Sequence, residues 1–286
     1  MTEATRPEQV VSGLLFGEGP RWHDDRLYFS DIGAGRVQRL TGDGALETIV
    51  EVPGRPSGLG WRPDGALLIS SMHDHRLLAF DGTALSEVAD LSAFCGGHLN
   101  DLVVDAQGRA YVGNIGFSLE ATPVDPRPTH VVRVDPDGRA QSAADDLMAP
   151  NGMVITPDGG TLIVAESGRA CLTAFPIDSN GDLGPRRCYA TLPEGAAPDG
   201  ICLDAEGAVW VASPTTNEFL RVREGGEVAR RVPTGGRPGI ACMLGGSDRR
   251  TLYLITAPTM SIESSIPLAD GRIERLRVDV PGAGRP

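Results

Sequence analysis

An internal repeat that runs through almost the whole chain is the strongest constraint on its fold. Each copy has a special residue usually followed by Gly, an apolar strand, a turn rich in Asp and Gly, and a second apolar strand. The copies span residues 18–32, 57–71, 100–114, 151–167, 199–213 and 240–257. They begin roughly 40 to 50 residues apart, which is the repeat length of a propeller blade with four strands.

The repeat predicts an all-β protein, a six-bladed β-propeller with four-stranded antiparallel blades, formed by residues 1–286 as a single domain. The 37 Gly and 22 Pro among many short apolar runs also favour a turn-rich β protein over a helical bundle. One recognisable strand, at 272–280, follows the last repeat. We therefore expect an N-terminal strand, Val10 to Phe16, to complete that sheet and close the ring, which hides strand edges.

Charge and composition exclude several kinds of function. The net charge of -12 argues against a nucleic-acid partner, because phosphate binding relies on a basic surface. All 26 basic residues are Arg, so Schiff-base chemistry and a phosphate-loop lysine are excluded. Five Cys without a C-x-x-C motif indicate buried thiols in a reducing compartment. The polar residues 1–9 indicate neither a signal peptide nor a membrane span, so we expect a cytoplasmic protein without a membrane partner.

The first residue of each repeat is predicted to lie on the rim of the central channel, because the first strand of every blade lines that channel. These six rim residues are Glu18, Ser57, Asn100, Asn151, Asp199 and Ile240. Asn or Asp at one such position can simply shape a turn, but oxygen ligands at four of six equivalent positions predict a shared site. Two carboxylates and two amides form an oxygen-only set that suits Ca²⁺ or Mg²⁺ and also accepts Mn²⁺ or Zn²⁺. One divalent ion is expected, with calcium as the first candidate.

The chain resembles the gluconolactonase, regucalcin (senescence marker protein) and luciferin-regenerating enzyme family over almost its full length. The residues that carry the likeness are EGPRW (18–22) and the runs at 100–113, 150–167, 198–212 and 241–256. The resemblance implies a six-bladed propeller whose metal ligands are Glu18, Asn151 and Asp199. It places Asn100 at the position that contacts substrate.

The same resemblance implies a metal-dependent hydrolase of the lactonase type, which opens a small, sugar-like or otherwise hydroxylated lactone. A divalent ion would polarise the lactone carbonyl, and Asp199 would accept a proton from the attacking water. Asn100 would donate to substrate oxygens, with Asp101 just behind it. Two alternatives stay open: the same metal propeller acting on an aryl ester, an organophosphate or a specialised metabolite, or a calcium-binding propeller without catalysis.

One departure from the family concerns the substrate. Sugar-lactonase members have an Arg two residues before the substrate-contacting Asn, and this chain has His98 there. Arg offers a rigid fork to hydroxyl groups and His a single donor, so a substrate other than gluconolactone is favoured. His98 is therefore either a substrate contact or acid–base group, or a loop residue without a role.

Two further features have alternative interpretations. The Pro-rich stretch 116–130 is either a surface insertion or a lid whose Glu120 touches substrate. His73 lies either in a solvated turn or at the active face.

Overall fold

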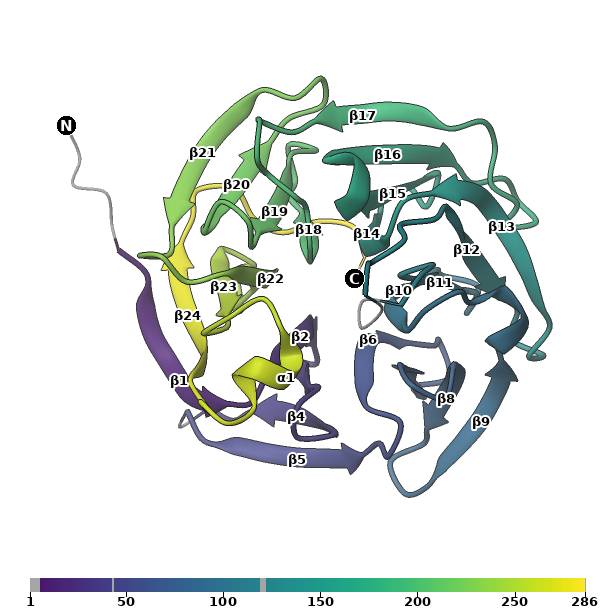
Figure 1. The fold of residues 1–286 in the computed structure, drawn as a ribbon, viewed down its shortest axis with the longest axis horizontal. Coiled ribbons are helices and arrows are strands. Elements are labelled where there is room, and N and C mark those ends of the chain that lie inside the picture. Colours follow the sequence, from purple (N-terminus) through teal and green to yellow (C-terminus); the bar gives the residue numbers. More distant parts are fainter. Residues whose placement is uncertain (1–5, 43, 119–121, 286) are drawn as a thin grey trace.

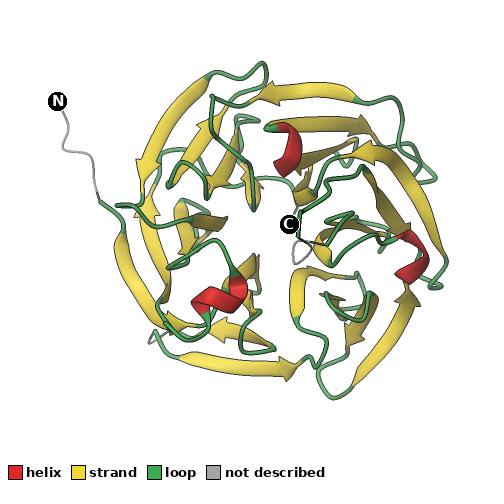
Figure 2. Cartoon of the chain, in the orientation of Figure 1, coloured by secondary structure: helices red, strands yellow, loops and turns green. Residues whose placement is uncertain are grey.

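The computed structural model describes residues 6–42, 44–118 and 122–285, and it confirms the predicted six-bladed β-propeller (Figure 1). Six four-stranded antiparallel sheets stand around a central axis, and the helical segments between strands are short (Figure 2). In the described ranges these segments are the α-helix α1 (Ile262–Ser265) and the 3₁₀ turns at Ser92–Phe94 and Ser167–Arg169. No helix of that part of the chain is long and apolar enough to cross a membrane.

Each blade takes four strands in chain order, apart from the last, which includes the first strand of the chain. Blade 1 contains β2 (Gly17–His23), β3 (Arg26–Asp31), β4 (Arg36–Leu40) and β5 (Leu46–Glu51). Blade 2 contains β6 (Pro56–Trp61), β7 (Leu67–Ser71), β8 (Arg76–Phe80) and β9 (Leu85–Asp90). Blade 3 contains β10 (Leu99–Val104), β11 (Ala110–Asn114), β12 (Thr129–Val134) and β13 (Ala140–Leu147).

The other three blades follow the same plan. Blade 4 contains β14 (Pro150–Ile155), β15 (Thr161–Glu166), β16 (Cys171–Pro176) and β17 (Arg187–Thr191). Blade 5 contains β18 (Ile201–Leu203), β19 (Val209–Ser213), β20 (Glu218–Val222) and β21 (Val228–Pro233). Blade 6 contains β22 (Gly239–Gly245), β23 (Thr251–Thr256), β24 (Gly271–Arg277) and β1 (Glu8–Leu14).

Blade 6 is therefore assembled from both ends of the chain, as the sequence predicts. Strand β1 pairs antiparallel with β24, with Glu8 opposite Arg275 and Leu14 opposite Gly271. The buried side chain of Leu14 joins the core cluster of this blade, and the carboxylate of Glu8 forms an ion pair with Arg275 at 2.9 Å. The ring is thus closed by hydrogen bonds, apolar packing and an exposed ion pair.

The first strands of the blades surround the central channel, and a local irregularity at the rim aims side chains into it (Figure 1). In five blades the pairing between the first and second strands changes register at or directly beside the rim residue. A β-bulge of this kind bends its strand and redirects a side chain, and such bulges are frequent beside active sites. The bulges place the rim residues at the mouth of the channel and leave the rest of each strand regular.

Glycine follows the rim residue in several repeats because the first strands of neighbouring blades come very close there. A Cβ atom on Gly58 would lie 2.3 Å from the backbone nitrogen of Leu102. One on Gly152 would lie 2.6 Å from the backbone nitrogen of Ile201. A side chain at either position would force adjacent blades apart, so the repeated glycine has a packing function.

Candidate functional site

Two acidic side chains meet at the rim of the channel. The carboxyl groups of Glu18 in β2 and Asp199, just before β18, hydrogen-bond to each other. Burial is the main cause that raises the pKa of Glu18 well above its usual range, and the charges of Asp199 and Asp101 raise it further. Burial also raises the pKa of Asp199, against the hydrogen bonds from Glu18 and Asn151. Carboxyl groups placed in this way need a shared proton or a nearby cation.

Asn151 supplies the third oxygen beside this pair. Its Nδ2 donates to Oδ1 of Asp199 at 2.6 Å and to the hydroxyl of Ser167 at 3.4 Å. Its Oδ1 is buried and has no hydrogen-bond partner among the described residues. A buried acceptor without a donor is costly, and a cation bound by this oxygen would remove the cost. The residues present therefore fit a hard divalent ion.

The amide is essential to such a centre. In the described part of the chain, no group of three or more His, Cys, Asp or Glu side chains is arranged to hold a metal. Glu18 and Asp199 provide only two carboxylates, so Asn151 has to complete the set. Ser167 is a contact that sequence reasoning missed: its hydroxyl donates to the carbonyl of Pro198 at 2.6 Å and helps to orient Asn151.

Asn100 lies on the adjacent part of the rim and is held by two long hydrogen bonds. Its Oδ1 accepts from the hydroxyl of Ser57 at 3.5 Å, and its Nδ2 donates to the carbonyl of Pro150 at 3.4 Å. Bonds at the upper limit of hydrogen-bond length are weak, so this amide can change partners at little cost. Ile240, the sixth rim residue, is buried and has no polar side-chain atom.

Asp101 lies in a buried ion pair beneath the rim. Its Oδ1 accepts from Nη2 of Arg21 at 2.5 Å, and the two side chains are 4% and 3% exposed. Arg21 also donates to the carbonyls of Leu59 at 2.7 Å and Leu102 at 2.6 Å. The guanidinium thus ties the first strands of blades 1, 2 and 3 together. The structure places Asp101 close to the rim carboxylates, but its carboxylate is paired with Arg21. The sequence did not indicate this partner.

His98 lies in the loop before β10, and its ring stacks on His73 with centroids 4.4 Å apart and an angle of 14° between the planes. The same loop touches the 116–130 insertion, because a Cβ on Gly97 would lie 2.2 Å from the carbonyl oxygen of Phe117. The structure therefore places His73 beside His98 on the rim face. Glu120 lies outside the described residues, so its predicted contact with substrate is untested.

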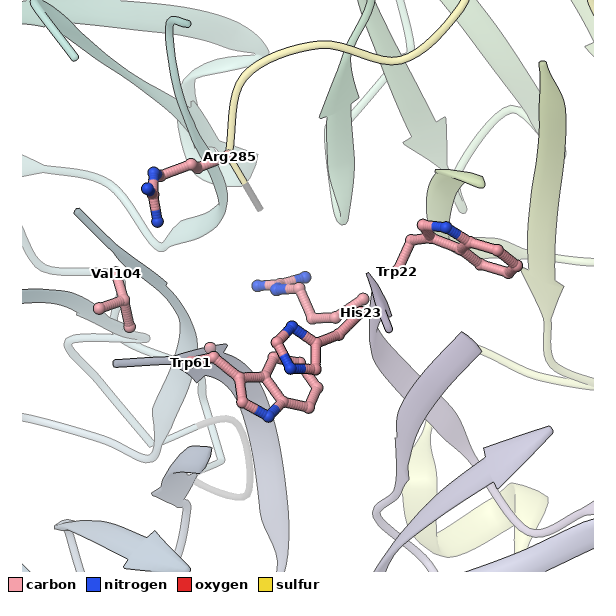
Figure 3. A pocket seen from close by; sticks show the side chains of 7 residues that line it. Trp22, His23, Trp61, Val104 and Arg285 are labelled. Carbon is pink, nitrogen blue, oxygen red and sulfur yellow. The ribbon is translucent and has the colours of Figure 1, made fainter. Parts of the chain in front are cut away.

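The opposite mouth of the channel holds a separate pocket of about 100 Å³ (Figure 3). There the ring of His23 lies flat on Trp61, with centroids 4.0 Å apart, and Arg285 lines the far side. Trp22 packs instead on Tyr253 of the neighbouring blade. Arg21 lines this pocket and also binds Asp101, so its side chain lies between this pocket and the rim.

Comparison with known proteins gives concordant matches. The family profile described as "SMP-30/Gluconolactonase/LRE-like region" matches residues 16–258. A 6-deoxy-6-sulfogluconolactonase of Pseudomonas putida is 29% identical over 282 residues, covering 95% of this chain and 94% of the relative. Pentonolactonase XacC of Haloferax volcanii is 28% identical over 290 residues, covering 97% of this chain and 95% of the relative. The crystal structure of regucalcin from Agrobacterium tumefaciens, described as a calcium-binding protein, superimposes with a TM-score of 0.81 at 22% identity, covering 99% and 96% of the two chains.

Proposed function

The chain belongs to the SMP-30/gluconolactonase/LRE-like family, and we propose that it is a lactonase-type hydrolase that uses one divalent metal ion, with calcium as the first candidate. The main support for a metal ion is the buried Oδ1 of Asn151. This oxygen lies next to the carboxyl groups of Glu18 and Asp199 and has no hydrogen-bond partner among the described residues. Two relatives are themselves named as lactonases, and a structural neighbour is described as calcium-binding. The names of the two lactonases support a small lactone as the substrate.

The residues of the rim divide between binding and chemistry. Glu18, Asn151 and Asp199 would hold the ion. When bound, such an ion supplies positive charge to the lactone carbonyl oxygen and favours the ionised form of water. Asp199 accepts a proton of the water as the water oxygen bonds to the carbonyl carbon, and it returns this proton to the ring oxygen as the carbonyl C–O bond of the ring breaks. The amide of Asn100 donates to a substrate oxygen and gives up its long bond to Pro150.

The residues beneath and beside the rim position this site. Arg21 fixes the first strands of three blades, and Asp101 supports Asn100 from below through that ion pair. His98 stands two residues before Asn100, where it can reach a ring substituent of the substrate. Asp101 is thus a positioning residue, and His98 is a substrate contact.

Metal analysis and a lactone panel test the proposal. Chelated protein should regain one divalent ion per chain, and Asp199→Ala and Asn151→Ala should lose it, while Ser57→Ala, a rim variant without a ligand role, should retain it. Ring opening releases a proton, so a pH indicator follows turnover across lactones and esters with each metal. Unchanged divalent-ion affinity in Asp199→Ala would refute the metal site. No turnover of any lactone or ester with any metal would refute the hydrolase and leave the calcium-binding alternative.

A further inference from the structure

Three exposed apolar side chains lie in connections on the face that carries the proposed metal site. The large hydrophobic side chains exposed on the described surface are Val124, Met260 and Leu268, at 44%, 59% and 55%. Val124 lies in the insertion between β11 and β12, and the other two lie between β23 and β24. Since the first strand of each blade starts at the rim, the second strand ends there. Both connections therefore rise from the rim face, where apolar surface is available to a ligand.

A pocket of about 330 Å³ lies behind Met260, between the α1 segment and the entry loops of blades 2 and 3. Its apolar walls are Met72, Met260 and Ile262, and the stacked rings of His73 and His98 add a flat surface. This volume is at the small end of the roughly 300 to 1,000 Å³ typical of small-molecule sites. Unbranched Met side chains adapt readily to different apolar shapes.

The pocket adjoins the proposed active site on its open side. His98 stands two residues before Asn100, and Arg55, another lining residue, stands two residues before Ser57. The hydroxyl of Ser57 donates to Oδ1 of Asn100, so these two entry loops meet at the rim. A ligand held at Asn100 can therefore extend into the pocket.

The charges at the edge of this pocket are already paired. Nη1 of Arg55 lies 2.5 Å from Oε1 of Glu263 in α1, and this ion pair ties α1 to blade 2. Ile262 packs against the core cluster that contains Met72, and Ser261 caps the helix by accepting from the N–H of Ser264 at 3.2 Å. The α1 segment thus forms one wall of the pocket, and Glu263 in α1 pairs with the guanidinium of Arg55 at its edge.

We propose that this pocket seats an apolar alkyl or aryl substituent of the lactone ring, and that alkyl-substituted lactones are preferred to polyhydroxylated ones. This inference rests on the proposed lactonase function. A polyhydroxylated substituent would lose bound water against Met72, Met260 and Ile262, whose side chains offer no hydrogen-bond partner in return, and that loss disfavours binding. An alkyl chain would gain contact with Met72, Met260 and the histidine pair.

The test compares three substrates: γ-butyrolactone, γ-nonanolactone with its five-carbon tail, and glucono-δ-lactone. Each methylene that becomes buried is expected to raise kcat/KM by roughly fourfold, so γ-nonanolactone should exceed both others. The ratio of kcat/KM for γ-nonanolactone over γ-butyrolactone should fall about tenfold in Met260→Asp, which loses apolar contact and adds a charge. Leu268→Asp is the matched control, because Leu268 is similarly exposed in the same connection but does not line the pocket. Its ratio should equal that of the wild type.

The outcomes separate the two proposals. Preference for glucono-δ-lactone, or an equal ratio in Met260→Asp and Leu268→Asp, overturns the pocket inference and leaves the lactonase intact. If no lactone is hydrolysed, the proposed function is wrong, and calorimetric titration with γ-nonanolactone then decides the pocket. Absent binding, or binding unaffected by Met260→Asp, overturns it. Binding lost in Met260→Asp and retained in Leu268→Asp supports it.

Discussion

Replacing Arg21 by Met should destabilise the propeller more than any ordinary surface change. The Asp101 carboxylate is 4% exposed and would stay buried without its cation. The carbonyls of Leu59 and Leu102 would each lose a donor that now lies within 2.7 Å. Removing one partner of a buried ion pair costs about 3–5 kcal/mol, and we expect a loss of unfolding free energy in that range.

A double-mutant cycle isolates the ion pair from the loss of packing. Asp101→Asn keeps the shape of the side chain and removes its charge, so the double variant Arg21→Met/Asp101→Asn contains no buried unpaired charge. Its loss of unfolding free energy should be smaller than the sum of the single losses by about 1–3 kcal/mol. Urea unfolding followed by far-UV circular dichroism measures all four proteins.

Two results would contradict this reasoning. A cost below about 1 kcal/mol for Arg21→Met, or additive costs in the double variant, would show that the pair contributes little to stability. A direct substrate role for Asp101 predicts a different pattern. Asp101→Asn would then raise KM while its unfolding free energy stayed at the wild-type value.

Three further predictions follow from the rim. The pKa values of Glu18 and Asp199 are raised in the folded protein, so folding favours their protonated forms. The unfolding free energy of the metal-free protein should therefore fall as the pH rises from about 4 through the raised pKa values of these two groups. Added Ca²⁺ should reverse this fall. An unfolding free energy that stays constant between pH 4 and 8 in urea titrations would count against the prediction. Gly152→Ala should cost about 1–3 kcal/mol and weaken metal binding, because the new Cβ would lie 2.7 Å from the backbone oxygen of Asp199. In the control Gly160→Ala, the three atoms nearest to the new Cβ belong to the side chain of Asp158, at 3.4 Å or more. Equal costs for the two variants in urea unfolding would contradict the packing argument. His98→Arg should raise kcat/KM on aldonolactones, since Arg offers a bidentate donor to hydroxyl groups, and unchanged kinetics would refute the substrate argument.

The repeat made the fold and the ring of rim residues predictable, because equivalent positions in a propeller meet whatever their separation in the chain. Glu18 and Asp199 are an example: they meet at the rim from blades 1 and 5. The closing strand was also predicted, although it spans Glu8–Leu14 rather than Val10 to Phe16. These features depend only on periodicity and on the need to pair strand edges.

Contacts that cross between blades without periodicity could not be predicted in the same way. Arg21 lies within a motif that was recognised, but its pairing with Asp101 depends on the close approach of three first strands. The stacking of His73 on His98 depends on two loops from different blades. The bond between Arg55 and Glu263 joins residues far apart in the chain through an irregular connection. Irregular segments have no repeating pattern from which such partners can be inferred.

The closure of blade 6 has a consequence for biosynthesis. Strand β1 is synthesised well before its partner β24, because the strands of five blades and two strands of the sixth lie between them in the chain. At roughly 5–20 residues per second, a nascent chain carries β1 unpaired for tens of seconds. Until then the growing protein is an open arc, and Glu18 and Asp199 stand on either side of the gap that blade 6 fills. The two rim carboxyl groups therefore reach their final positions only after blade 6 has been synthesised and packed, and the proposed ion would bind after that step.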